Sequence, residues 1–81
     1  MIVDLWDHSV ELKIDGGDHF RCISGSREAM EYMAQSWPTK RGKELSAARK
    51  ACLKAIEGEV AAADAEAAFV RAAEKAGILR Q

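Results

Sequence analysis

The stretch Trp37-Pro38-Thr39-Lys40-Arg41-Gly42 decides how two helices of this chain meet. Proline disfavours helical backbone in the residue before it, so the helix upstream should end near Ser36. Trp37 continues the apolar side of that helix, and Gly42 stands where the next helix begins. We therefore predict a structural corner formed by Trp37, Pro38 and Gly42, with the indole buried. An exposed indole that stacks on a base or on a partner is the alternative.

The helix before this corner is indicated by apolar residues at helical spacing. Met30, Met33 and Ala34 recur with Trp37 at intervals of three and four residues, which places them along one side of a helix. Ser26 stands before this run, and its hydroxyl oxygen is predicted to cap the helix N-terminus. The first helix is therefore expected between Ser26 and the corner.

Two further helices are predicted after the corner. The second runs from about Gly42 to a stop at Gly58, and the third spans about 63–76 with Gly77 as its stop, because glycine is favoured just after a helix C-terminus. The apolar side of the second helix consists of Leu45, Ala48, Cys52 and Ile56. On the third helix the apolar stripe consists of Phe69 and alanines, so Phe69 should anchor that helix in the core.

A β-hairpin is predicted before the helices. Apolar and polar residues alternate from Val10 to Ile14, which is typical of a half-buried strand. Phe20 and Cys22 alternate with Arg21 in a second strand, and Gly16-Gly17 separates the two. This order of elements predicts a single α+β domain over 1–81, an antiparallel hairpin packed on three helices.

The register of this hairpin follows from the loop length. A three-residue loop at Asp15-Gly16-Gly17 pairs Leu12 with Phe20 and puts the apolar residues of both strands on one face. A two-residue turn at Gly16-Gly17 would pair Leu12 with Arg21 and turn Phe20 outward. Because a slip of one residue moves every side chain to the other face, we predict the longer loop.

A hairpin alone is marginal in water, so it must pack on the helices or gain a strand. Residues 2–6 are a candidate for a third short strand, and a second protomer that pairs along the edge is the other. Whether residues 2–6 form a strand stays open.

Composition excludes several classes of protein. The 81 residues are 48% apolar and 31% charged, which is the profile of a soluble globular domain. The longest apolar run is far too short for a membrane span, and the N-terminus lacks the basic start of a secretion signal, so we expect a cytoplasmic protein. Cys22 and Cys52 are predicted to be two buried thiols, with a bridge between them as the minority alternative.

Patterns typical of catalysis or of a cofactor site are missing. His8 and His19 are predicted to face solvent, and His19 with Cys22 and Cys52 lacks the spacing of a structural zinc site. No phosphate-binding loop or nucleophile motif occurs in the chain. We therefore expect no enzymatic activity, no cofactor and no metal, and we identify no small-molecule substrate.

Positive charge is concentrated in one segment, although the net charge is −1. Residues 1–20 carry five carboxylates and one lysine, whereas residues 40–54 carry six basic residues and one glutamate. The candidate basic patch consists of Lys40, Arg41, Lys43, Lys50 and Lys54. A solvated helix face is the default interpretation. A site for nucleic acid or another polyanion, and a contact with the acidic N-terminal region within or between chains, are the alternatives.

The order of these features resembles one known family. The matching elements are Val10-Glu11-Leu12, Ser26-Arg27-Glu28-Ala29, Trp37 to Gly42, Ala67-Ala68-Phe69 and Ala76-Gly77-Ile78. In this order and spacing the chain is similar to the short bacterial proteins of the domain of unknown function 982 family. The resemblance covers nearly the whole chain and implies no activity and no cofactor.

Two functions remain for a small domain of this kind. The leading hypothesis is a non-enzymatic interaction or regulatory module that uses the basic corner or the hairpin edge, with a homodimer as one form of it. The alternative is a weak nucleic-acid or polyanion binder through the basic helix face. An overall pI near 6.1 and a Trp-Pro corner in place of a glycine-type turn argue against a dedicated helix-turn-helix DNA binder.

Overall fold

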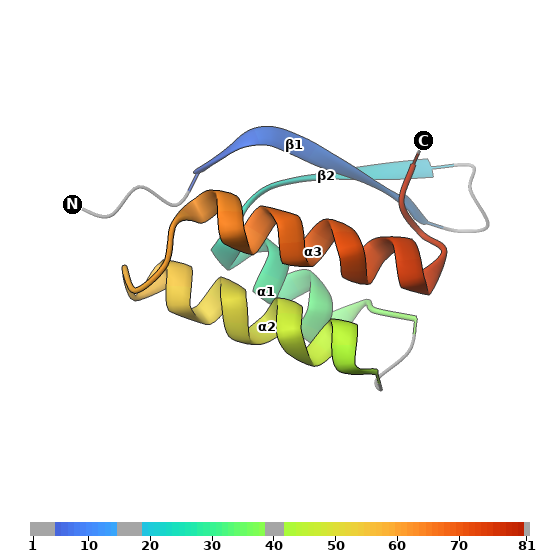
Figure 1. The fold of residues 1–81 in the computed structure, drawn as a ribbon. Coiled ribbons are helices and arrows are strands. Elements are labelled where there is room, and N and C mark those ends of the chain that lie inside the picture. The colour runs from blue at the N-terminus through green and yellow to red at the C-terminus, as the bar shows by residue number, and fades with distance from the viewer. Residues whose placement is uncertain (1–4, 15–18, 39–41, 81) are drawn as a thin grey trace.

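The computed structural model describes residues 5–14, 19–38 and 42–80 and has the predicted α+β architecture (Figure 1). The elements are β1 (Leu5–Ile14), β2 (His19–Gly25), α1 (Ser26–Gln35), α2 (Lys43–Ile56) and α3 (Ala62–Ala76). Within this described part, no helix has both the length and the apolar character that crossing a bilayer requires.

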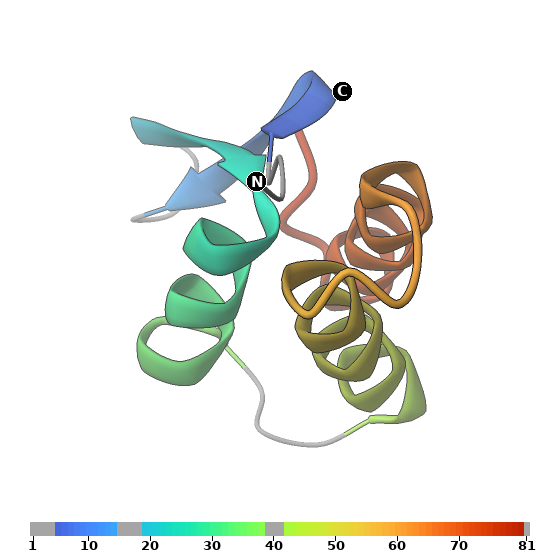
Figure 2. The same ribbon diagram turned by 90° about the vertical axis from the view of Figure 1, so that its left-hand side faces the viewer.

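The hairpin covers one side of the helices. As Figure 2 shows, α1 lies beneath β2 and α3 beneath β1, while α2 packs against both other helices on the side away from the strands. The closest packing between helices joins α2 and α3, whose facing residues are mostly alanines that let the backbones approach. The face of α2 that carries the lysines therefore points away from the sheet.

The register of the hairpin differs from the prediction. The antiparallel pairs are Val10–Ile23, Glu11–Cys22, Leu12–Arg21, Lys13–Phe20 and Ile14–His19. The predicted pairing of Leu12 with Phe20 is wrong, and Phe20 points to the outer face with 43% of its surface exposed. The reason lies further along β2, which continues to Gly25 and buries Ile23 completely. Ile23, which the prediction left out of the second strand, takes the inner position.

The same register exposes one of the two cysteines. Cys52 is completely buried in α2, as predicted, but Cys22 lies on the outer face of β2 and is exposed. Neither thiol is in a disulfide, and the prediction of two buried thiols is wrong for Cys22 alone. An alternating strand that buries Ile23 must turn the side chain before it outward.

The additional pairing on the sheet comes from the C-terminus. Leu5 and Trp6 of the candidate third strand belong to β1 itself, and residues 1–4 lie outside the described residues. Instead, Leu79 forms an isolated antiparallel bridge with Leu12. The Lys13 N–H donates to the Ile78 carbonyl at 2.7 Å, and the Arg80 N–H donates to the Glu11 carbonyl at 3.0 Å. This segment covers the edge of β1 that β2 leaves open.

The start of α1 also departs from the prediction. Gly25 is its N-cap, and Ser26 is the first helical residue with its side chain fully buried. The Ser26 hydroxyl oxygen accepts a hydrogen bond from Trp6 Nε1 at 3.1 Å. Ser26 therefore provides an acceptor for a buried indole N–H and is not the N-cap of the helix. The Glu28 carboxylate reaches back instead and accepts the Ser24 N–H at 2.9 Å.

The buried side of α1 is rotated relative to the predicted stripe. Ala29, Tyr32 and Met33 are buried, whereas Ala34 is exposed. The prediction for Ala34 is wrong because Tyr32 packs its ring edge-on against Trp37, with 6.1 Å between the ring centroids. A large ring gains more from burial than a methyl group does, so Tyr32 rather than Ala34 faces the core.

Three aromatic side chains join the sheet to the helices. Phe69 is completely buried, and its ring centroid lies 5.3 Å from that of Trp6 and 5.6 Å from that of Trp37. Trp37 is only 4% exposed, which confirms its predicted burial and rules out the exposed indole. The prediction that Phe69 anchors α3 in the core is confirmed as well.

The predicted helix ends are also confirmed. α1 stops at Gln35, α2 ends before Gly58, and α3 ends at Gly77, whose φ of 74° lies in the left-handed region that favours glycine. Each of these helix ends is set by a proline or glycine next to it in the sequence, and tertiary packing does not shift it.

Candidate interaction surface

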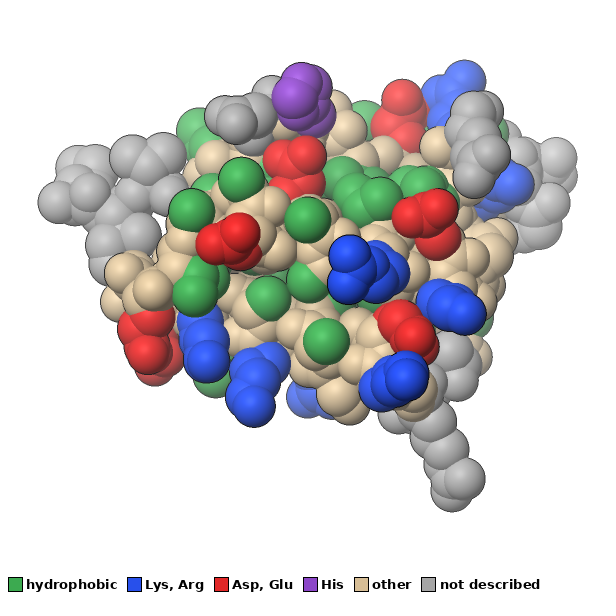
Figure 3. All heavy atoms as spheres, in the orientation of Figure 1, with side chains coloured by type: hydrophobic (Ala, Val, Ile, Leu, Met, Phe, Trp, Pro, Cys, Tyr) green, Lys and Arg blue, Asp and Glu red, His purple; other side chains and the backbone are tan. Residues whose placement is uncertain are grey.

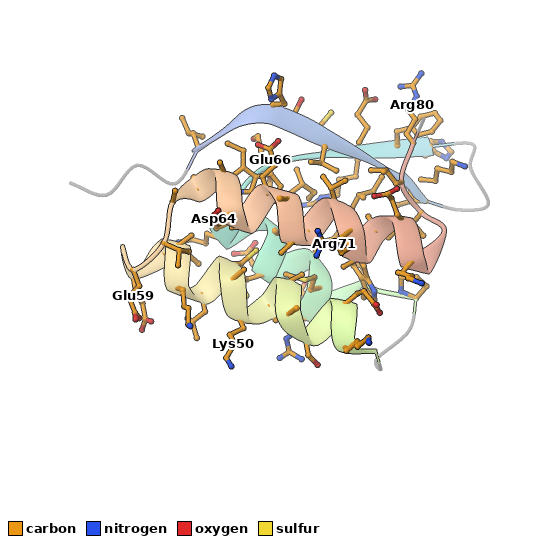
Figure 4. All side chains as sticks on the ribbon, viewed as in Figure 1. Lys50, Glu59, Asp64, Glu66, Arg71 and Arg80 are labelled. Carbon is orange, nitrogen blue, oxygen red and sulfur yellow. The ribbon has the colours of Figure 1, made fainter. Side chains whose placement is uncertain are left out.

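The outer face of α2 carries a row of lysines. Lys43, Lys50 and Lys54 are seven and four residues apart, so they fall on one line along a helix of 3.6 residues per turn. All three are exposed, and Figure 4 shows Lys50 extending from α2 away from the rest of the molecule. Lys40 and Arg41, the other members of the predicted patch, lie outside the described residues.

Beside these lysines the surface between α2 and α3 is hollowed. One hollow of about 280 Å³ is lined by Lys43, Glu44, Ala47, Ala68 and Arg71. A second of about 290 Å³ is lined by Ala47, Lys50, Ala51, Lys54, Val60 and Asp64. Ala47 lines both hollows, so they lie next to each other along α2. We call this surface the basic groove.

The floor of the basic groove is apolar because the residues along the seam are small. Alanine side chains stop close to the helix backbone, whereas the lysines beside them reach outward and form a rim. Figure 3 shows this face, with hydrophobic side chains spread over α2 and α3 and with Lys and Arg side chains on both helices, interspersed with Asp and Glu. The arrangement suits a partner that has an apolar stripe with charge beside it.

The charge of the basic groove is positive but mixed. Lys43, Lys50, Lys54 and Arg71 line it together with two carboxylates, Glu44 and Asp64. Ion pairs between described residues lie elsewhere, on the side of the strands: Glu11 with Arg80, and His8 with Glu66 at 3.8 Å. The alternative that pairs these lysines with the acidic N-terminal region of the same chain has no ion pair among the described residues.

An acidic pair stands at the end of the lysine row. Glu57 and Glu59 lie in the connection that follows α2. The pKa of the Glu57 carboxyl is raised above its ordinary value, first by a side-chain hydrogen bond with Glu59, then by desolvation and by the like charge of Glu59. At neutral pH the negative charge of this pair ends the positively charged row of lysines on that side.

Arg71 is a member of the groove that sequence reasoning missed. It lies on α3, so its place beside Lys43 depends on how α2 and α3 pack. Ala68 is half-buried on the seam, and Arg71 follows it by three residues, which places the two on the same side of α3. This helical spacing was the signal in the sequence that could have identified Arg71. Figure 4 shows Arg71 on the α3 side of the seam, facing the viewer over the groove.

The residues considered for chemistry do not meet. His8 and His19 are exposed as predicted, and His19 lies on the opposite face of β2 from Cys22, because the two are three residues apart in a strand. No cluster of three or more potential metal ligands occurs among residues 5–14, 19–38 and 42–80.

Comparison with known proteins gives one match. A family model described as "Protein of unknown function (DUF982)" matches residues 8–80. Neither a curated protein nor a solved structure matches the chain.

Proposed function

The chain belongs to the DUF982 family of proteins of unknown function, and for it we propose a non-enzymatic interaction module whose basic groove binds an acidic amphipathic helix of another protein. The observation that carries this proposal is the row of Lys43, Lys50 and Lys54 beside an apolar seam. A helix laid in a groove of this kind buries its apolar stripe and pairs its flanking carboxylates with the rim.

The shape of the groove favours a helix over an extended peptide. A strand would need a free sheet edge for its backbone hydrogen bonds, whereas α2 and α3 have satisfied theirs within each helix. The seam follows two neighbouring helices, so its apolar positions repeat at helical spacing. A third helix matches that spacing when it packs with its own side chains between theirs.

The lining favours an acidic protein segment over nucleic acid. Glu44 and Asp64 lie within the groove, and a phosphate backbone would meet them as like charges. Phosphate contacts also leave an apolar floor unused, and the pI near 6.1 lies far below that of a dedicated nucleic-acid binder. Nucleic acid is therefore an outcome of the test and not the partner we propose.

The non-enzymatic part of the proposal is supported by the positions of His19 and Cys22 on opposite faces of β2. A bacterial cytoplasmic location is also part of it. Neither Cys22 nor Cys52 is in a disulfide, and Cys22 is exposed, which suits a reducing compartment.

The experiment measures binding of a fluorescein-labelled peptide of about 20 residues with an alanine and leucine stripe flanked by glutamates. A peptide with each glutamate replaced by lysine is the control ligand. The double variant K50E/K54E is compared with K75E, because Lys75, like Lys54, lies in the last turn of its helix and lies outside the groove.

We expect K50E/K54E to bind the acidic peptide about tenfold more weakly than K75E does, since two exposed ion pairs contribute about 0.2–1 kcal/mol each and reversal adds repulsion. Affinity should fall as salt rises. Equal affinity of the two variants would refute the proposal. Tighter binding of duplex DNA than of the acidic peptide would replace it with the polyanion binder, and self-association abolished by K50E/K54E in sedimentation would name a second copy as the occupant.

A further inference from the structure

A second hollow lies away from the basic groove, beneath the end of the hairpin at which β1 ends and β2 begins. It has a volume of about 470 Å³, larger than either part of the basic groove. Its lining includes Lys13, Ile14, Arg21, Tyr32, Ser36 and Ile78. Two of these side chains are cationic, and no carboxylate lines the hollow among the residues that the structure describes. We call it the hairpin hollow.

The hairpin hollow exists because of the observed register. Pairing Leu12 with Arg21 sends Arg21 to the inner face and Phe20 to the outer face. The other register would bury the Phe20 ring here, a gain of roughly 1.5–3 kcal/mol for a fully buried phenylalanine.

Arg21 is held above a rigid platform. Its guanidinium carbon lies 5.7 Å from the centroid of the Tyr32 ring, and that ring is 94% buried, edge-on to Trp37. A cation–π contact with a ring uses the charge of the guanidinium and leaves its N–H groups able to donate hydrogen bonds. The ion pairs recorded between described residues do not include Arg21. A carboxylate matches this fork with two parallel hydrogen bonds.

The remaining lining is suited to an apolar body. Ile14 and Ile78 are half-buried and pack against the core, with the Tyr32 ring beside them. The volume lies within the range of about 300–1,000 Å³ that is typical of small-molecule sites. Inorganic phosphate would leave these apolar walls without a partner, whereas a ring that carries a carboxylate contacts both the walls and the arginine.

We propose that the hairpin hollow binds a small aromatic or aliphatic carboxylate, with Arg21 pairing the carboxylate and Ile14, Tyr32 and Ile78 contacting its apolar body. This site is independent of the basic groove, since α2 contributes none of the lining named here. The ligand class is defined by one negative charge at the end of a compact apolar group.

The test is a titration of the ¹⁵N-labelled protein with phenylacetate, followed by two-dimensional NMR, with phenylacetamide as the neutral control of nearly equal shape. We expect saturable shifts at the amides of Arg21, Tyr32 and Ile78. Phenylacetamide should bind about tenfold more weakly or not at all, because it lacks the charge that the arginine pairs.

Three variants complete the experiment. R21Q should weaken phenylacetate binding about tenfold. The affinity of R21K should fall between those of R21Q and the parent, because lysine keeps the positive charge but lacks the two parallel N–H donors of arginine. R27Q, on α1, should bind phenylacetate like the parent. The proposal would be overturned by chemical shift changes that do not saturate or that spread over the whole surface. It would also be overturned if phenylacetamide bound as tightly as phenylacetate, or if R21Q bound phenylacetate as tightly as R27Q does. Unchanged spectra of R21Q away from the hollow show that the variant is folded.

Discussion

Replacing each of the two phenylalanines by alanine tests both the core and the register of the hairpin. Phe69 is completely buried between Trp6 and Trp37, whereas Phe20 keeps 43% of its surface exposed on the outer face of β2. The same chemical change is thus made at a core position and at a surface position of one small domain.

The expected magnitudes follow from these environments. Phe69→Ala removes a ring from the centre of the core, which costs about 3–5 kcal/mol, and its two aromatic contacts place it toward the upper end. Phe20→Ala loses about half of a burial free energy of roughly 1.5–3 kcal/mol. It also loses the Arg80 guanidinium 4.3 Å above the ring, a contact that contributes about 0.5–1 kcal/mol when exposed. We expect about 1.3–2.5 kcal/mol in total for Phe20→Ala.

Urea unfolding followed by tryptophan fluorescence measures both values. A domain of this length has a free energy of unfolding of about 4–12 kcal/mol, so Phe69→Ala removes a third or more of it. With an m-value of about 1–3 kcal/mol/M, the midpoint should fall by more than about 1 M. Phe69→Leu keeps much of the buried volume and gives a measurable intermediate if Phe69→Ala unfolds.

Equal destabilisation by the two alanine variants would refute the reasoning. It would mean that Phe20 is as buried as Phe69, which only the register that pairs Leu12 with Phe20 allows. The hairpin hollow would then have no Arg21 at its roof, and the proposal built on it would fail as well.

Three other changes have defined outcomes. Ser26→Ala leaves the buried Trp6 Nε1–H without its acceptor and should cost about 1–3 kcal/mol in urea unfolding, with Trp6→Phe in the same background recovering part of that loss. Gly77→Ala meets no atom within 4 Å but forces alanine to φ 74°, so thermal unfolding should show a loss of about 1–2 kcal/mol; no loss would contradict the left-handed helix end. Glu59→Gln should lower the pKa of Glu57 toward its ordinary value in an NMR titration. A raised carboxyl pKa means that the folded state binds protons more tightly than the unfolded state, so protonation of Glu57 stabilises the fold at low pH. The parent loses this contribution as pH rises through the raised pKa, and the Glu59→Gln variant should lose a smaller one.

The sequence by itself determined the helices and where they stop. Pro38, Gly58 and Gly77 act on the backbone of their immediate neighbours, so the helix ends need no knowledge of the fold. Apolar spacing indicates the buried side of a helix only approximately, since Tyr32 faces the core of α1 in place of Ala34. The burial of Trp37 and Phe69 followed from the same periodicity. The lysine row of α2 was visible for the same reason, because residues seven and four apart share a helix face.

The tertiary structure alone decided the register of the hairpin. Phe20 and Ile23 are both apolar and lie three residues apart, so they cannot share one face of a strand. The chain buries Ile23, because β2 runs directly into α1 and carries that end of the strand over the core. No local pattern in the strand distinguishes the two choices, since the free energy that separates them comes from contacts with helices far along the chain.

Long-range packing likewise placed the residues that complete both proposed sites. Arg71 joins the lysines only when α3 packs on α2, and Arg21 meets Tyr32 only in the observed register. The C-terminal segment that pairs with β1 at Leu12 lies 67 residues from its partner, Leu79. Sequence patterns predict a helix or strand from residues that are close together in the chain. A surface made by two such elements depends on how their side chains pack, which involves residues far apart in the sequence.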